Sequence, residues 1–425
     1  MLHSVRGSSY YSVTLMPSVA KRKRPGVPIP SSFTPLDASA RLASLRSVLS
    51  SRSLGGYVVP SADAHSSEYV SAVDARRAWL TGFTGSAGLA LVTHSAALLW
   101  TDGRYFVQAA EQLGGGPWTL MKMHEPGVPS LEEYVAKEQR CLRGPIGIDP
   151  ALATLSATKA WADKGCNPCA LIESNLVDEV WTHQPERPAA AVVARTLADS
   201  GESVSCKLGR VGSALGMSGC DGIVLNALDQ ICWLFNIRGA DIECNPVCFA
   251  YAVVTRTGGA DGGDAGGGGA DGKSVRATLY LRWLDGSGTE SEAAEAKKKK
   301  ALDEHFRSEG CATFNDDTVD ADSSTPTGVS VVLRRYADFN AEEAWRALTL
   351  HHASPAVMLE RGIRASHMSH PISSLHLSHA FFPHVPPPPP SIYPPVSKSG
   401  VSSTFCLQKW RLLHLLSQKV ASPPP

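Results

Sequence analysis

Apolar positions in the first part of the chain alternate between helical spacing and strand spacing. The stretch D-A-S-A-R-L-A-S-L-R-S-V-L (37–49) places leucines on one helical face, with Asp37 as the expected N-cap. G-Y-V-V-P (56–60) is a short apolar run typical of a buried strand. A-G-L-A-L-V-T-H-S-A-A-L-L-W-T-D (87–102) predicts two strands joined by a tight turn.

The alternation continues along the chain. Helical spacing is predicted over 68–80, 104–113 and 130–138, and strand-like runs occupy 118–123, 146–149, 250–254 and 277–283. Strands that alternate with helices predict an α/β fold with mixed sheets and flanking helices.

A weak internal repeat relates two stretches of the chain. Each copy opens with a glycine before an apolar run and carries an aspartate seven residues later, then a Trp-Leu pair with a glycine six residues after the tryptophan. The matching positions are Gly56, Asp63, Trp79 and Gly85 in one copy, and Gly222, Asp229, Trp233 and Gly239 in the other. We therefore predict two related α/β domains, 37–185 and 186–350, which meet near Q-P-E-R-P (184–188).

Three segments differ in composition from these domains. The glycine-rich stretch 258–272 lies between two strand-like runs and predicts a flexible hairpin loop. Residues 1–36 contain no acidic residue and several basic ones. This composition is typical of an organelle transit segment and also of a disordered leader, and both interpretations stay open. Residues 351–425 are rich in His and Pro, have no acidic residue after Glu360, and predict a disordered tail.

Charge and cysteine content narrow the class of protein. The charges of forty basic and forty acidic residues cancel, so we expect no nucleic acid as partner. The longest apolar runs are too short for a membrane span, so we expect no membrane partner either. Ten cysteines without an N-terminal secretory segment indicate reduced thiols and a cytoplasmic location, with organelle import as the alternative. The pairs Cys166/Cys169 and Cys244/Cys248 are separated too widely for a compact zinc finger, which favours scattered thiols.

Several unusual motifs occur in one order along the chain. They are P-S-A-D-A-H-S-S-E-Y (60–69), G-F-T-G-S-A-G (82–88), W-T-D-G-R-Y-F-V-Q-A (100–109), N-L-V-D-E-V-W-T-H-Q-P-E-R-P (175–188) and A-L-D-Q-I-C-W-L-F-N-I-R-G-A-D-I-E-C-N-P-V (227–247). In these motifs the chain resembles the first two domains of the cytosolic three-domain type of aminopeptidase P, over roughly residues 38–285. The resemblance implies two creatinase N-terminal-like domains and a part in removing the N-terminal residue of a peptide whose second residue is proline.

The resemblance also implies a third, catalytic domain with the pita-bread fold. In that family this domain holds two divalent metal ions, usually manganese, through carboxylates and one histidine, and the metals activate a water molecule. The region where these ligands would lie has no acidic residue after Glu360. We therefore expect this chain to lack the catalytic domain, its catalytic residues and its metal cofactor, and to be inactive alone. Whether the chain is an enzyme stays open. The alternative is a non-enzymatic binding or dimer-interaction module, and a homodimer stays open.

Arg104 is the candidate substrate-binding residue. It follows Asp102-Gly103 at the expected start of a helix, where a guanidinium can be presented outward. The resemblance implies that the Arg of D-G-R-Y contacts the peptide substrate, and the structural alternative is a salt bridge to Asp102 or to another acidic residue of the domain. For Asp63 and His65 we expect capping and turn roles in preference to substrate contact.

Overall fold

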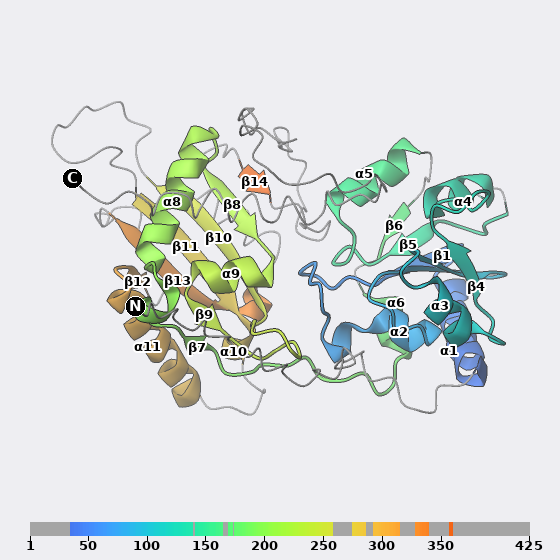
Figure 1. The fold of residues 1–425 in the computed structure, drawn as a ribbon, viewed down its shortest axis with the longest axis horizontal. Helices are drawn as coiled ribbons and strands as arrows, with labels where there is room; N and C mark the ends of the chain where they lie inside the picture. Colours follow the sequence, from blue (N-terminus) through green and yellow to red (C-terminus); the bar gives the residue numbers. More distant parts are fainter. Residues whose placement is uncertain are drawn as a thin grey trace, which may run out of the picture.

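Two six-stranded mixed sheets organise the chain, each in its own lobe (Figure 1). The first lobe holds strands β1 to β6, and the second holds β8 and β10 to β14. The segment that follows α6 runs along one side of the molecule and joins the lobes (Figure 1). The computed structural model describes residues 35–138, 141–164, 169–172, 174–257, 274–285, 292–314, 328–339 and 357–359.

The first sheet has the strand order β4-β3-β2-β1-β5-β6, and its central strand β1 pairs antiparallel with β2 and parallel with β5. Its strands are β1 (Gly56–Pro60), β2 (Leu89–Thr93), β3 (Ala97–Thr101), β4 (Thr119–Lys122), β5 (Ile146–Ile148) and β6 (Cys169–Leu171). The helices of this lobe are α1 (Pro35–Ser51), η1 (Ala72–Asp74), α2 (Arg76–Thr81), α3 (Phe106–Leu113), α4 (Leu131–Glu138), α5 (Leu155–Asp163) and α6 (Leu176–Val180).

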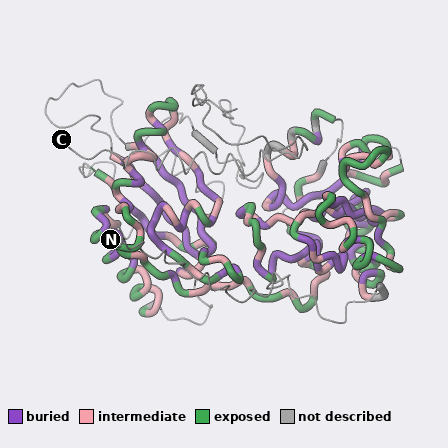
Figure 2. The backbone as a smooth tube through the Cα atoms, in the orientation of Figure 1, coloured by how far each residue is buried: buried purple, intermediate pink, exposed green. Residues whose placement is uncertain are grey.

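Helices cover both faces of the first sheet. Tyr57 and Val59 lie in a cluster with apolar side chains of α1, α2, α3 and α6, whereas Val58 lies in a cluster with side chains of α4 and α5. The strands therefore carry apolar residues at successive positions, as expected for a sheet buried on both sides. Figure 2 shows the central strands of this lobe as buried, whereas the outer helices and the edge strand β4 are more exposed.

The second sheet has the order β12-β13-β11-β10-β8-β14. Its strands are β8 (Gly222–Leu225), β10 (Ala250–Thr257), β11 (Ser274–Leu281), β12 (Ala312–Phe314), β13 (Val329–Arg335) and β14 (Val357–Leu359). A two-stranded sheet pairs β7 (Val193–Ala194) with β9 (Ile237–Arg238). The helices are α7 (Leu197–Ser200), α8 (Val204–Met217), α9 (Leu228–Leu234), α10 (Arg282–Asp285), α11 (Glu292–Ser308) and η2 (Tyr336–Asp338).

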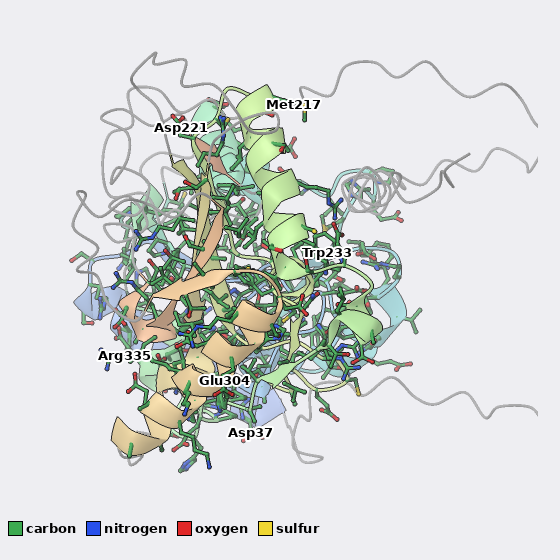
Figure 3. The ribbon with its side chains drawn as sticks, turned by 90° about the vertical axis from the view of Figure 1, so that its left-hand side faces the viewer. Asp37, Met217, Asp221, Trp233, Glu304 and Arg335 are labelled. Atoms are coloured by element: carbon green, nitrogen blue, oxygen red, sulfur yellow. The ribbon has the colours of Figure 1, made fainter. Side chains whose placement is uncertain are left out.

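Helix α8 packs closely across the second sheet (Figures 1 and 3). A Cβ atom at Gly212 would lie 2.4 Å from a methyl carbon of Val275, so this glycine allows the close approach. Lys207 of α8 is buried, and its Nζ donates to the carbonyl oxygen of Trp233 and to Oδ1 of Asn236, each at 2.7 Å. These bonds fix α8 against α9, and Trp233 lies beside α8 in Figure 3.

The strand pairing confirms that the two glycines of the predicted repeat lie on equivalent strands. Gly56 opens β1 and Gly222 opens β8, and each strand has an antiparallel neighbour on one side and a parallel neighbour on the other. The antiparallel partners match in register as well: Gly56 lies opposite Thr93, and Gly222 lies opposite Thr255. The order β4-β3-β2-β1-β5 in one sheet therefore corresponds to β13-β11-β10-β8-β14 in the other.

Three local expectations differ from the structure. Asp37 is not the N-cap of the first helix, because α1 begins at Pro35 and places Asp37 in its first turn. The helix predicted over 68–80 begins only at Ala72 and is divided into η1 and α2, since Ala75 between them leaves the helical conformation. The second sheet also extends beyond the boundary predicted at residue 350, because Val357–Leu359 forms β14 and pairs with β8. A three-residue apolar run is easily missed in a His- and Pro-rich segment.

Several expected features fall partly or wholly outside the described residues. Strands β10 and β11 form the antiparallel pair expected of a hairpin, but its glycine-rich loop 258–272 lies outside the described residues. The basic segment 1–34, Cys166 and residues 360–425 also lie outside them. Within the described part of the chain, no helix has both the length and the apolar character that a membrane span requires.

Candidate functional site

Arg104 lies in the turn between β3 and α3 and is largely exposed. Oδ1 of Asp102 accepts hydrogen bonds from the Arg104 backbone N at 3.0 Å and from Nε at 2.9 Å, and Oδ2 accepts one from Nη2 at 2.7 Å. These hydrogen bonds hold the pKa of the Asp102 carboxyl below its usual value. The structural alternative, an ion pair, is thus present, yet 69% of the Arg104 side chain stays exposed. Nη1 has no hydrogen bond to any described residue.

A buried guanidinium, that of Arg77, orders the loops around this turn. Its Nε donates to Ser61 Oγ at 2.7 Å, its Nη1 donates to the carbonyl oxygen of Phe83 at 2.8 Å, and its Nη2 donates to the carbonyl oxygen of Gly85. Ser61 Oγ in turn donates to the carbonyl oxygen of Gly88 at 2.7 Å. Burial lowers the pKa of Arg77 to about 10. Arg77 therefore joins the motif P-S-A-D to the motif G-F-T-G-S-A-G.

The D-G-R-Y turn is fixed to the same loops through Tyr105. Its hydroxyl lies 2.7 Å from Ser86 Oγ, and its ring stands edge-on to that of Phe83. A Cβ atom at Gly85 would lie 2.8 Å from the Tyr105 ring and closer still to that of Phe83, so only glycine fits there. Three motifs that are separate in the sequence thus meet beside Arg104.

A second group of charged residues lies in and beside the motifs, near the segment that joins the lobes, where one carboxylate binds two arginines. Asp74 accepts hydrogen bonds from Arg76 Nη1 at 2.8 Å, from Arg187 Nη1 at 2.9 Å and from Arg187 Nη2 at 2.8 Å. Arg76 also donates to both carboxylate oxygens of Asp178, and Gln184 Nε2 donates to Oδ1 of Asp178 at 2.8 Å. We call these five residues the junction cluster. Its arginines outweigh the effect of burial and lower the pKa of Asp74.

His65 reaches from the first lobe into the second beside the junction cluster. Its Nδ1 lies 2.8 Å from the carbonyl oxygen of Asn226, and its Nε2 lies 2.8 Å from the Tyr336 hydroxyl. A carbonyl oxygen only accepts, so Nδ1 carries the proton, and in the neutral ring Nε2 accepts from Tyr336. The imidazole is 1% exposed and lies 4.6 Å from the Tyr251 ring centroid, and its burial lowers its pKa. Figure 1 shows the segment after β1 extending toward the second lobe.

The turn role expected for Asp63 is confirmed. Its Oδ1 accepts hydrogen bonds from the backbone N of His65 at 3.0 Å and of Ser67 at 2.9 Å, which shapes the segment that carries His65. The expectation for His65 itself was incomplete, because its imidazole connects the lobes. Both residues lie in the motif 60–69. The contacts of His65 with the second lobe could not be predicted from the spacing of residues within that motif.

The family of these motifs follows from comparison with known proteins. The Creatinase/Prolidase N-terminal domain matches residues 41–179, and a second form of the same domain matches residues 183–260. The chain carries creatinase/prolidase N-terminal domains. The junction cluster and His65 are thus the places where two such domains meet in this chain.

Relatives of these creatinase/prolidase N-terminal domains include larger proteins. A probable Xaa-Pro aminopeptidase P of Pyricularia oryzae is 44% identical over 225 residues, which make up 52% of this chain and 36% of that protein. A protein of the same description from Fusarium vanettenii gives the same identity over 225 residues, again 52% of this chain and 36% of that protein. The chain therefore spans little more than a third of the curated relatives it matches.

A solved structure resembles the chain over a longer range. It is that of an X-prolyl aminopeptidase from Caenorhabditis elegans, described as a cytosolic enzyme with a di-nuclear active site. The two superpose with a TM-score of 0.59 at 29% identity, over 78% of this chain and 48% of that one.

The described residues do not fit a di-nuclear metal centre. Within the described ranges, no three side chains of His, Cys, Asp or Glu gather into a group that could hold a metal ion. Asp241 illustrates why: its carboxylate oxygens accept from the backbone N of Ala190 and of Phe249, each at 2.7 Å, so it serves the local structure. The cysteines of the pair Cys244/Cys248 have different surroundings, because Cys248 is buried and Cys244 is exposed.

Proposed function

We propose that this chain provides the substrate-side, N-terminal part of a metal-dependent Xaa-Pro aminopeptidase, with Arg104 as the residue that contacts the peptide. The observation that carries the proposal is the exposed guanidinium of Arg104, held in one orientation by Asp102. The names of the relatives support the substrate class, a peptide with proline at its second position.

The geometry around Arg104 suits recognition of a polar peptide group. Asp102 uses Nε and Nη2, which fixes the guanidinium plane and leaves Nη1 directed away from the carboxylate. An arginine whose plane is already fixed loses less conformational entropy when it donates to a peptide carbonyl or carboxylate. The loops ordered by Arg77 and Tyr105 supply the rigid support that such a contact needs.

A peptide titration tests this contact. A proline-containing tripeptide is added to the 15N-labelled chain, and chemical shifts are followed for wild type, Arg104→Ala and Arg335→Ala. Arg335 is the matched control, because it is also exposed and pairs with a nearby aspartate, Asp338. We expect Arg104→Ala to weaken binding at least several-fold and Arg335→Ala to leave it unchanged. Equal affinities for all three chains would contradict the assignment.

We also propose that the 425-residue chain has no peptidase activity alone. Activation of a water molecule by two metals requires several acidic ligands at one place. The assay measures release of the first residue from an Xaa-Pro peptide with and without manganese. We expect no release above a mock-purified control, and manganese-dependent release would refute this part of the proposal. The names of the relatives do not favour the alternative of a non-enzymatic module.

We propose a cytosolic location, because the similar enzyme from Caenorhabditis elegans is described as cytosolic. A fluorescent fusion to the complete chain, compared with one that starts at Pro35, tests it. Organelle import that depends on residues 1–34 would overturn it. A homodimer stays a prediction from the family resemblance, and light scattering checks it.

A further inference from the structure

The second lobe contains two cysteines in direct contact. Sγ of Cys232, on α9, lies 3.7 Å from Sγ of Cys248, in the segment before β10, and the two residues are 16 positions apart. Both side chains are buried, and neither belongs to the candidate site. A disulfide has a sulfur–sulfur distance of about 2.05 Å. The two sulfur atoms therefore need only a small movement toward each other to form a bond.

The surroundings hold both cysteines in place. A Cβ atom at Gly239 would lie 2.6 Å from Cβ of Cys248, so Cys248 is packed directly against the chain at Gly239. Phe249, the next residue, donates its backbone N to Asp241, which also accepts from Ala190 in the segment that joins the lobes. Cys232 is fixed by α9, which Lys207 anchors through the carbonyl oxygen of Trp233. Two thiols with little freedom to separate have a high effective concentration toward each other.

We propose that Cys232 and Cys248 form a reversible intramolecular disulfide when the protein meets a peroxide oxidant. This modification goes beyond the proposed function and does not depend on it. The bond would tie α9 to the start of β10 and so stabilise the part of the second lobe that faces the junction. Phe249 transmits the constraint, because its ring lies 4.9 Å from the guanidinium carbon of Arg187 and 5.5 Å from the His65 ring centroid.

The chemistry balances with hydrogen peroxide as the oxidant. The thiolate of one cysteine attacks a peroxide oxygen, the O–O bond breaks, and the departing hydroxide takes up a proton to leave water and a sulfenic acid. The second sulfur then attacks the sulfenic sulfur, the S–O bond breaks, and hydroxide leaves with the second thiol proton as water. Two thiols are oxidised to one disulfide while peroxide is reduced by two electrons. Cys232 is suited to the first attack, because it is the less buried of the two thiols and its hydrogen bond with Cys248 lowers its pKa.

The test uses the complete 425-residue chain. The folded protein is treated with hydrogen peroxide, remaining thiols are alkylated, and peptides are mapped by mass spectrometry without reduction. We expect the peptide pair that contains Cys232 and Cys248 to be the main cross-link and to disappear after dithiothreitol. Reduced Cys232 and Cys248 after treatment, or cross-links confined to the exposed Cys141, Cys206 and Cys244, would overturn the proposal.

Thermal unfolding gives a second measurement that does not depend on a variant folding well. The oxidised wild type should melt roughly 5 °C or more above the reduced form, because the bond closes a loop in the unfolded chain. Cys248→Ala should show no such difference, whereas Cys311→Ala, which removes a buried cysteine outside the pair, should keep it. An equal rise in Cys248→Ala and wild type would show that another pair is responsible.

Discussion

The chain uses the same chemical pair, arginine with aspartate, in two places with opposite surroundings. In the junction cluster, the side chain of Asp74 is 1% exposed and accepts hydrogen bonds from two arginines, one of which comes from the segment that joins the lobes. At the D-G-R-Y turn, Asp102 binds Arg104 with similar distances, but the guanidinium is largely exposed. Hydrogen-bond geometry alone therefore does not separate a buried pair from an exposed one.

Solvent decides what each pair contributes. Water screens the Arg104–Asp102 pair, so it adds little to the stability of the fold and leaves the arginine available to a ligand. In the junction cluster the charges have lost most of their water, and each depends on its partners for compensation. The buried pairs fix the segment that joins the domains against the first domain, and the exposed pair orients one side chain. The predictions below test this distinction, from the largest expected effect to the smallest.

Removal of the Asp74 charge should have the largest effect. In Asp74→Asn, Arg187 loses its only carboxylate partner among the described residues, and Arg76 keeps only Asp178. We expect the free energy of unfolding to fall by about 3 kcal/mol or more, as measured by urea denaturation. Asp199→Asn, at an exposed aspartate paired with Arg195, is the control and should leave the free energy of unfolding nearly unchanged. Equal losses in the two variants would contradict the comparison.

Arg77 sharpens the comparison, because it is a buried arginine whose hydrogen-bond partners are neutral. Arg77→Met leaves the carbonyl oxygens of Phe83 and Gly85 without their donor. Each buried acceptor without a partner costs roughly 1–3 kcal/mol, so we expect a loss of roughly 2–4 kcal/mol in the same denaturation experiment. Arg52→Met, at an exposed ion pair with Glu179, is the matched control. A loss below about 1 kcal/mol for Arg77→Met would show that the loops do not need this guanidinium.

His65 adds a dependence on pH to the contact between the lobes. Burial lowers its folded-state pKa, so the unfolded chain binds the proton more readily below pH 6.5. Its contribution is therefore complete above about pH 6.5 and is lost as the pH falls through the folded-state pKa, by up to about 1.4 kcal/mol per pH unit. Unfolding measured from pH 7.5 to 5 should show a shallower slope in His65→Gln than in wild type. His94→Gln is the control, and a His65→Gln slope equal to that of wild type would refute the prediction.

The exposed pair should have the smallest effect on stability. Arg104→Ala removes a pair that solvent screens, so we expect the free energy of unfolding to change by less than about 1 kcal/mol. Thermal unfolding of the variant beside wild type measures this. A larger loss would mean that the D-G-R-Y turn depends on the ion pair, and the peptide titration would then report on folding as well as on binding.

The local pattern of apolar residues predicted the strands of each sheet better than it predicted the contacts between the two lobes. Gly56 and Gly222 could be matched because each precedes an apolar run and is followed seven residues later by an aspartate. The turn role of Asp63 could be predicted because its hydrogen bonds lie within four positions. The contacts between the lobes could not be predicted in this way: Asp74 and Arg187 are 113 positions apart, and His65 and Tyr336 are 271 apart. The only available signal was that these charged residues lie in or beside unusual motifs.

We expect the buried pair Asp74–Arg187 to fix the joining segment to the first domain and the exposed pair Asp102–Arg104 to contribute little to the fold. Double-mutant cycles at both pairs test it most directly, with Asp74→Asn and Arg187→Gln in one cycle and Asp102→Asn and Arg104→Gln in the other. The account predicts a coupling energy of roughly 2–3 kcal/mol for Asp74 with Arg187 and less than about 1 kcal/mol for Asp102 with Arg104. Equal coupling at the two pairs, or stronger coupling at Asp102, would contradict it.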